Sequence, residues 1–157
     1  MPSEYVGILI AAARRRIKQA ALARAARHGL SAQQFWFLVA VVEQPGSSPS
    51  EISERARTDA PTASRVLAAL EQRRLVRTAA DPADRRRTCV FPTPAGERLA
   101  PELIASAREI RAGVTAGMSP SEVERLREGL LRVIDNLERL GPAGVAPVAG
   151  SDKRRSA

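Results

Sequence analysis

The stretch TAADPADRRRTCVFPTPAG, Thr78 to Gly96, decides how this chain is interpreted. It places two acidic residues, three consecutive arginines and three prolines between an apolar run and a long helical segment. Such a stretch is either a disordered basic linker or a β-hairpin with a charged tip. Short β-like runs, LVRT and TCVF, flank the charged tip, and they favour the hairpin.

The tip of this hairpin has the residues that a tight turn requires. Pro82 stiffens the backbone, and Asp81 closes the turn with an Asx-type bond. Asp84 lies next to Arg85 and Arg86, which predicts an ion pair that orients one guanidinium and leaves the other free. A free arginine on a narrow, projecting loop suits the minor groove of DNA, where negative potential is concentrated.

Two helices precede the hairpin at the spacing of a helix-turn-helix. The first is PSEISERA, which starts after Ser48, and the second is expected from Thr62 to about Arg73. The inward face of the second helix is apolar: Ala63, Val66, Leu67 and Leu70. Its outward face carries Thr62, Ser64, Arg65 and Ala69, and such short hydroxyls with one arginine suit a helix in a major groove.

Helical periodicity also covers most of the remaining chain. Residues 6–27 form one amphipathic helix, and a second runs from the capping box of Ser31 and Gln34 to about Gln44. Leu30 and Phe35 form its hydrophobic staple. A long helix starts at Thr93–Pro94 and runs to about residue 116, and a second SPSE motif at 119–122 starts the last helix, 120–140.

The last helix carries apolar residues at alternating spacings of three and four, which is typical of a coiled-coil seam. The seam consists of Val123, Leu126, Leu130, Val133, Leu137 and Leu140. Val6 and Leu9 of the first helix are also apolar and are expected to be buried against another surface. We expect both sets to lie in a homodimer interface, although packing within one monomer is the alternative. Residues 141–157 are expected to be a disordered tail.

Composition limits the classes of function. The chain has 157 residues, 44% of them hydrophobic and 3% aromatic, with a net charge of +8. The basic excess favours polyanionic partners, of which nucleic acid is the commonest inside cells. A single cysteine, Cys89, and a single histidine leave no nucleophile–base pair and no metal-ligand cluster. We expect no enzyme, cofactor, metal or membrane span, and a cytoplasmic, nucleoid-associated location.

The order of the segments LSAQQFWFL, SPSEISERA, TASRVLAALEQRRLVR and DPADRRRTCVFPTPAG resembles the MarR (multiple antibiotic resistance regulator) family. These are dimeric winged-helix regulators, and the wing of the family reads roughly D-x-x-D-R-R, a short strand, then L-T-x-x-G. The residues that match this motif are Asp81, Asp84, Arg85, Arg86, Thr93 and Gly96. The resemblance covers about residues 5–140.

The resemblance implies a mainly α fold with a small two- to three-stranded β wing. It divides the chain into a dimerisation helix (1–28), a winged helix-turn-helix lobe (29–93), C-terminal dimerisation helices (94–140) and a tail (141–157). It implies double-stranded DNA and a second copy as partners, with a pseudo-palindromic operator. The predicted DNA contacts are Ser48, Ser50, Thr62, Ser64, Arg65, Arg85, Arg86 and Arg87, with Asp81 and Asp84 bracing the wing.

Family members commonly respond to aromatic or phenolic acids, so a repressor released by such a ligand is the expected function. Candidate pocket residues are Arg15, Arg16, His28, Trp36 and Phe37. Two other functions stay open: a redox-responsive regulator that uses Cys89, whose pKa the neighbouring arginines would lower, and an architectural or RNA-binding module that senses nothing. Cys89 is expected to be a plain strand residue, because redox-sensing relatives generally place their cysteine in the N-terminal helical region.

Two positions depart from the family pattern. Arg74 stands where a glycine is usual between the recognition helix and the first strand, which predicts a differently shaped helix end. Pro92 replaces the usual leucine at the end of the second strand, which removes a ladder hydrogen bond at a tolerant edge.

Overall fold

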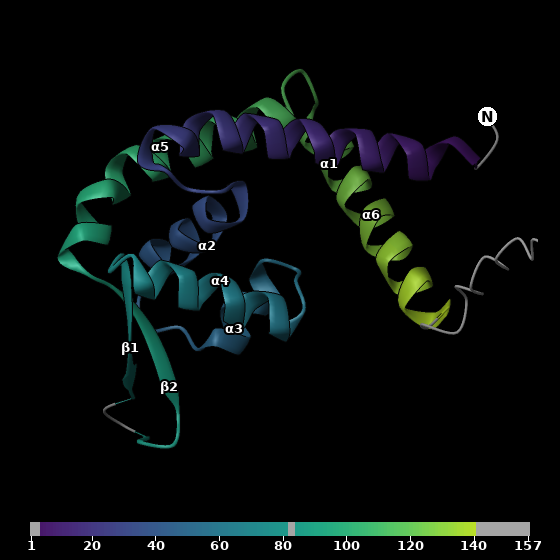
Figure 1. The fold of residues 1–157 in the computed structure, drawn as a ribbon. Helices are drawn as coiled ribbons and strands as arrows, with labels where there is room; N and C mark the ends of the chain where they lie inside the picture. The colour runs from purple at the N-terminus through teal and green to yellow at the C-terminus, as the bar shows by residue number, and fades with distance from the viewer. Residues whose placement is uncertain (1–3, 82–83, 141–157) are drawn as a thin grey trace, which may run out of the picture. The chain divides into compact units, whose positions relative to one another are not determined.

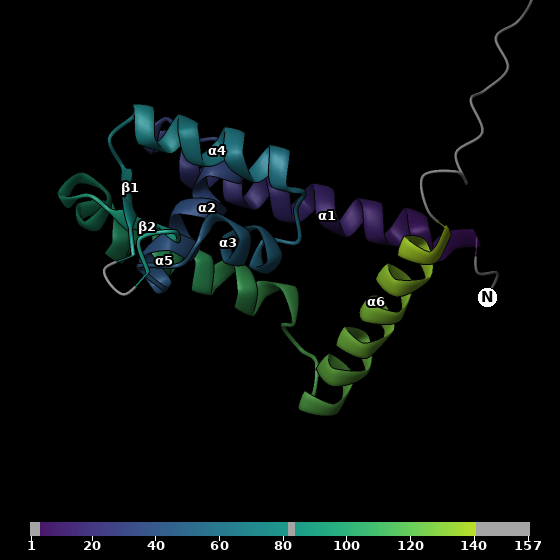
Figure 2. The ribbon, with the colours of Figure 1, turned by 90° about the horizontal axis from the view of Figure 1, so that it is seen from below.

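The computed structural model describes residues 4–81 and 84–140 (Figures 1 and 2). These residues fall into two compact units, within 1–114 and 115–157. The expectations for Pro82 and for the tail at 141–157 lie outside the described residues. No helix in the described ranges is long and apolar enough to cross a membrane.

The first two helices form where the sequence predicts them. Helix α1 spans Glu4–Ala25 and continues into a short 3-10 turn, η1, Ala26–His28. Gly29 then takes a left-handed conformation, with φ of 63°, and reverses the chain. Helix α2, Ala32–Glu43, begins with the predicted capping box: the Gln34 N–H donates to Ser31 Oγ at 3.1 Å, and the Ser31 N–H donates to Gln34 Oε1 at 2.9 Å.

The predicted helix-turn-helix consists of α3, Pro49–Arg55, and α4, Ala60–Gln72. The capping box of Ser48 and Glu51 starts α3 as expected. Helix α4 starts two residues before Thr62, because the Asp59 carboxylate accepts the Thr62 N–H at 2.8 Å and is the N-cap. The expected start at Thr62 is therefore two residues too late, and the Asp59 cap was not predicted.

Arg74 gives α4 the kind of end that glycine ordinarily forms, so the expectation of a different shape is wrong. Its φ is 56°, in the left-handed region. The Leu75 N–H donates to Leu70 O at 3.0 Å, and the Arg74 N–H donates to Glu71 O at 2.8 Å. These two bonds form a Schellman motif, which usually has glycine at this position.

Strands β1, Val76–Ala80, and β2, Thr88–Pro92, pair antiparallel with Val76 opposite Pro92 and Ala80 opposite Thr88. We call this hairpin the wing. A single β-bridge between Ser47 and Val90 adds a third chain segment at its base, which agrees with the predicted two- to three-stranded wing. Figure 1 shows the wing projecting away from α3 and α4.

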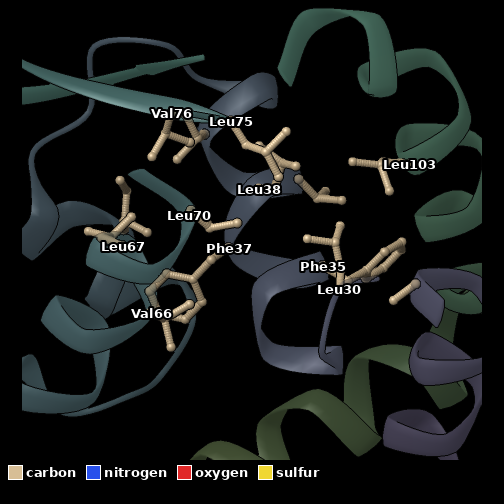
Figure 3. Close-up of a cluster of buried hydrophobic side chains, with 14 of the residues drawn as sticks. Leu30, Phe35, Phe37, Leu38, Val66, Leu67, Leu70, Leu75, Val76 and Leu103 are labelled. Atoms are coloured by element: carbon tan, nitrogen blue, oxygen red, sulfur yellow. The ribbon is translucent and has the colours of Figure 1, made fainter. Parts of the chain in front are cut away.

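The core of the first unit is aliphatic, with two buried phenylalanines. Figure 3 shows side chains from α2, α4, α5 and the start of β1 gathered together. Leu30 and Phe35, the predicted staple, are 3% and 0% exposed. The apolar face predicted for α4 is buried as a whole: Ala63, Val66, Leu67 and Leu70. This packing fixes which face of α4 remains exposed.

Helix α5, Pro94–Val114, follows the wing directly. Thr93 begins it by accepting the Gly96 N–H at 3.2 Å through its hydroxyl, and the Thr93 N–H donates to Leu75 O at 3.0 Å. The base of the wing is therefore tied to the start of α5 by backbone and side-chain bonds.

The second unit contains α6, Pro120–Leu140, with the bounds that the sequence predicts. Ser119 and Glu122 form its N-terminal cap, with the Ser119 N–H donating to Glu122 Oε2 at 2.8 Å. None of the residues of α6 is buried. In the predicted seam, Leu126, Leu130, Leu137 and Leu140 are between 38% and 65% exposed.

Candidate nucleic-acid interface

The exposed face of α4 presents a hydroxyl, an arginine and a serine within its first two turns. The Thr62 hydroxyl donates to Asp59 Oδ2 at 2.9 Å and accepts from Arg65 Nη2 at 3.2 Å. Arg65 Nε also lies 3.4 Å from Pro61 O. Ser64 is exposed beside them. The predicted residues Thr62, Ser64 and Arg65 thus share one surface at the start of the helix, and Asp59, which was not predicted, orients two of them.

Ser48 and Ser50 lie at the start of α3 in different environments. Ser48 Oγ accepts the Glu51 N–H at 3.2 Å, and the Ser48 N–H donates to Glu51 Oε2 at 2.8 Å. Ser48 is half-buried and Ser50 is exposed. In the first of these bonds the Ser48 hydroxyl oxygen is the acceptor, and in the second the backbone N–H is the donor. The hydroxyl proton takes part in neither bond and can still be donated.

The tip of the wing carries two exposed arginines, Arg85 and Arg86, that form no ion pair with any residue in 4–81 or 84–140. The predicted ion pair between Asp84 and a neighbouring arginine is wrong. Asp84 Oδ1 instead accepts the backbone N–H of Arg86 at 3.0 Å. The aspartate closes the turn, because its short side chain reaches the amide two residues on, and both guanidinium groups stay available.

The third arginine of the run has a different role. Arg87 Nη2 donates to Glu51 Oε1 and Oε2 at 2.6 and 2.7 Å, and Arg87 Nη1 lies 3.8 Å from Asp81 Oδ2. The hydrogen bond to Glu51 raises the pKa of Arg87. The pKa of Glu51 is lowered, first by the bond from the Ser48 N–H and then by Arg87. Of the two predicted bracing residues, Asp81 thus lies near Arg87 at the base of the wing.

A second anchor ties the wing to α4. Glu71 Oε1 accepts the backbone N–H of Thr78 at 3.0 Å and its hydroxyl at 2.9 Å. The hairpin is thus held on one side by α3 through Glu51 and on the other by α4 through Glu71. Neither glutamate was identified as an anchor from the sequence, because Glu51 lies 36 positions from Arg87 and the seven positions between Glu71 and Thr78 span the end of α4 and the start of β1.

Cys89 is 2% exposed in β2. Its Sγ lies 3.7 Å from Asp81 Oδ2. Burial raises the pKa of the Cys89 thiol, and the charge of Asp81 raises it further, while Arg87 acts in the opposite direction. The lowering of the pKa considered for a redox role is therefore wrong, because burial and the charge of Asp81 outweigh the effect of Arg87. This environment is that of a plain strand residue.

A groove of about 930 Å³ lies between α1, α2, the α3–α4 turn and α5. Of the candidate pocket residues, Trp36 and Phe37 line it. Arg15, Arg16 and His28 do not line this groove. On α1, Arg14 and Lys18 line it instead, because residues four apart share one helix face. His28 lies at the end of η1, with Nε2 3.3 Å from Glu102 Oε2.

The walls of the groove combine an aromatic surface with positive charge. Arg111 lies over the Trp36 ring, 5.7 Å from its centroid, and pairs with Glu43 at 2.6 Å. The hydrogen bond from Arg111 lowers the pKa of Glu43. The cations that line the groove are Arg14, Lys18, Arg55, Arg57 and Arg111. No cluster of three or more potential metal-ligating residues occurs within the described ranges.

Comparison with known proteins gives consistent matches. A family model described as MarR family matches residues 28–87. An uncharacterized HTH-type transcriptional regulator of Bacillus subtilis, YybA, is 27% identical over 110 residues, covering 70% of this chain and 73% of that protein.

Solved structures match over most of the chain. BpsR of Bordetella bronchiseptica, whose DNA binding is regulated by 6-hydroxynicotinic acid, is 30% identical with a TM-score of 0.68, and the match covers 86% of this chain and 96% of that one. The S. aureus MepR–DNA complex has a TM-score of 0.74 at 21% identity, with 87% and 99% of the two chains covered.

Proposed function

This chain belongs to the MarR family of DNA-binding transcriptional regulators, and on that premise we propose that it is a homodimeric repressor of a pseudo-palindromic operator, released by an aromatic or phenolic acid. The observation that carries the DNA-binding part is the pair of arginines, Arg85 and Arg86, that form no ion pair with any described residue and lie on a projecting hairpin anchored to both helices of the helix-turn-helix.

The exposed face of α4 supplies the contacts for the major groove. Arg65 is oriented by Thr62 and can reach a guanine edge, while Ser64 can contact a phosphate. Arg85 and Arg86 then contact the minor groove or its phosphates. Arg87 belongs to the anchor of the wing, and its contribution to DNA binding is to hold the tip in place.

Homodimer formation is supported by apolar surface in each unit. In α1, Tyr5, Val6, Ile8 and Leu9 are 47–66% exposed, and in α6 the four leucines of the seam are uncovered. Exposed leucine, isoleucine and tyrosine in such groups mark an interaction surface. A two-fold dimer would place two copies of α4 about one DNA turn apart, which requires an inverted repeat.

The ligand part of the proposal is supported by the groove. An aromatic ring fits against Trp36, and a carboxylate fits Arg14, Lys18 and Arg57, which form no ion pair with any described residue. The relative BpsR, at 30% identity, is regulated by an aromatic acid of this kind. A phenol without a carboxylate would use the aromatic wall alone and should bind more weakly.

Footprinting on the DNA around the gene of this protein tests the proposal. A protected inverted repeat supports it, whereas uniform coating would favour an architectural protein. The effector part is tested on that repeat with 6-hydroxynicotinate, 4-hydroxybenzoate and the uncharged 4-hydroxybenzamide. Release by an acid but not by the amide is expected. Release by peroxide that Cys89→Ser abolishes would instead favour the redox alternative.

A further inference from the structure

Arg57 lies in the turn between α3 and α4 and has a left-handed backbone, with φ of 48°. Ala56 is the C-cap of α3, and Arg57 follows it as the left-handed residue of a Schellman motif, as Arg74 does at the end of α4. Asp59, the N-cap of the recognition helix α4, follows two residues later. A displacement of Arg57 therefore acts directly on the start of that helix.

The turn around Arg57 is held by several bonds that do not involve its side chain. The Arg57 N–H donates to Glu54 O at 3.1 Å, and the Thr58 N–H donates to Ser53 O at 3.1 Å. The buried Ser53 hydroxyl donates to Thr58 O at 2.7 Å. The backbone is thus fixed from α3, while the guanidinium forms no hydrogen bond or ion pair with any residue of 4–81 or 84–140.

Arg57 is one of the basic residues that line the groove with Trp36. Of these cations, Arg111 is paired with Glu43, and Arg55 bonds to Gln44 and to Ser47 Oγ. Arg14 and Lys18 pair with no residue in the described part of the chain, but they belong to α1. Arg57 is therefore the cation that combines a free charge in the groove with a place in the segment leading into α4.

We propose that Arg57 transmits ligand binding to the recognition helix: the carboxylate of an acid in the groove pairs with its guanidinium and holds the α3–α4 turn, and with it the start of α4, in a position that does not fit the operator. This inference rests on the proposed function and adds the residue that couples the groove to DNA. Arg14 and Lys18 contribute to the affinity for the ligand without contributing to this coupling.

The test separates ligand affinity from coupling. Trp36 is the only tryptophan of the chain and lines the groove, so its fluorescence reports occupancy by the probe 4-hydroxybenzoate. Operator affinity is measured by fluorescence anisotropy without the probe and at saturating probe. For the wild-type chain, saturation should weaken operator binding by about tenfold or more.

Arg57→Asn removes the charge and keeps a residue that tolerates the left-handed conformation, so the fold should be retained. At saturating probe, its operator affinity should fall by less than about twofold. Arg14→Gln is the matched control, because it removes a free cation from the same groove but from α1. It should weaken probe binding and still show the full release at saturation. Arg57→Lys should restore part of the release.

Two results with Arg57→Asn would overturn this inference and leave the proposed function standing. One is full release from the operator at saturating probe. The other is weaker operator binding without probe, with a slope of log affinity against log salt concentration that is smaller by about one unit, as expected for the loss of a phosphate contact. If the wild-type chain binds its operator but is not released by any acid, the effector part of the proposed function fails and this inference fails with it.

Discussion

Arg87 Nη2 lies 2.6 Å from Glu51 Oε1, and this contact joins two residues that are 36 positions apart. Glu51 also accepts the backbone N–H of Ser48, so one carboxylate caps α3 and holds the base of the wing. This arrangement divides the arginine run into an anchor, Arg87, and two exposed residues at the tip that form no ion pair with any described residue.

Replacing Arg85 or Arg86 with alanine should weaken operator binding without changing stability, because neither guanidinium has a partner in the described chain. Each substitution should reduce the slope of log affinity against log salt concentration by about one unit. Anisotropy titrations at several salt concentrations measure this slope. Arg108→Ala, which removes an exposed arginine of α5, is the control and should leave the slope unchanged. An unchanged slope for Arg86→Ala would remove the wing tip from the interface.

Replacing Arg87 with alanine should weaken operator binding by a different route. Its charge is already compensated by Glu51, so the salt slope should change less than for Arg86→Ala, while amide hydrogen exchange in β1 and β2 should accelerate. Glu51→Gln should reproduce the faster exchange in β1 and β2, because glutamine can still accept the Ser48 N–H but forms no ion pair with Arg87. A slope change as large as that of Arg86→Ala would show that Arg87 contacts phosphate directly.

Gly96→Ala should destabilise the fold by about 1–3 kcal/mol. A Cβ at this position would lie 2.2 Å from the carbonyl oxygen of Leu75, and a backbone atom cannot move away cheaply. Gly113→Ala in the same helix is the matched control: nothing lies within 4 Å of its Cβ, so it should gain up to about 1 kcal/mol of helix propensity. Urea denaturation gives both free energies of unfolding. Equal effects would contradict the close approach at Leu75.

The cap of α4 should make stability depend on pH. The pKa of Asp59 is lowered, first by the Thr62 N–H and then by the Thr62 hydroxyl. A lowered folded-state pKa means that the stabilisation is complete above the ordinary aspartate pKa of about 3.9 and is lost as the pH falls through the folded-state value. Asp59→Ala should therefore lower Tm at neutral pH, and its difference from the wild type should close in acid. Asp59→Asn provides a cap that does not titrate, so the difference in Tm between Asp59→Asn and Asp59→Ala should not change with pH. A difference in Tm between the wild type and Asp59→Ala that persists in acid would contradict the assignment.

Substituting Leu130 or Leu137 with glutamate should convert the proposed dimer into monomers, because an unpaired carboxylate would be buried in an apolar seam. Sedimentation velocity measures the change directly. Arg132→Glu alters charge on the same helix at a position outside the seam and should leave the dimer intact. A wild-type chain that sediments as a monomer would contradict the dimer itself.

The helices that could be predicted from the sequence are those fixed by interactions between residues close together along the chain. Ser31, Ser48 and Ser119 each cap a helix together with a residue three positions on, so the starts of α2, α3 and α6 were predicted correctly. The apolar spacing of α4 likewise predicted its buried face. These interactions span at most one or two helical turns, and their partners are therefore visible as spacing.

The partners of the charged side chains could be identified only from the folded structure. Glu51 and Glu71 were not identified as wing anchors, and Arg14 and Arg57 replaced Arg15 and Arg16 in the groove. The left-handed backbone of Arg57 was equally invisible. An arginine can reach any carboxylate that folding brings within a few ångströms, and neither its spacing nor its type specifies that partner. The positions of the helices and the wing therefore follow from the local sequence. The packing of distant segments brings Glu51 to Arg87, while Arg85 and Arg86 stay exposed.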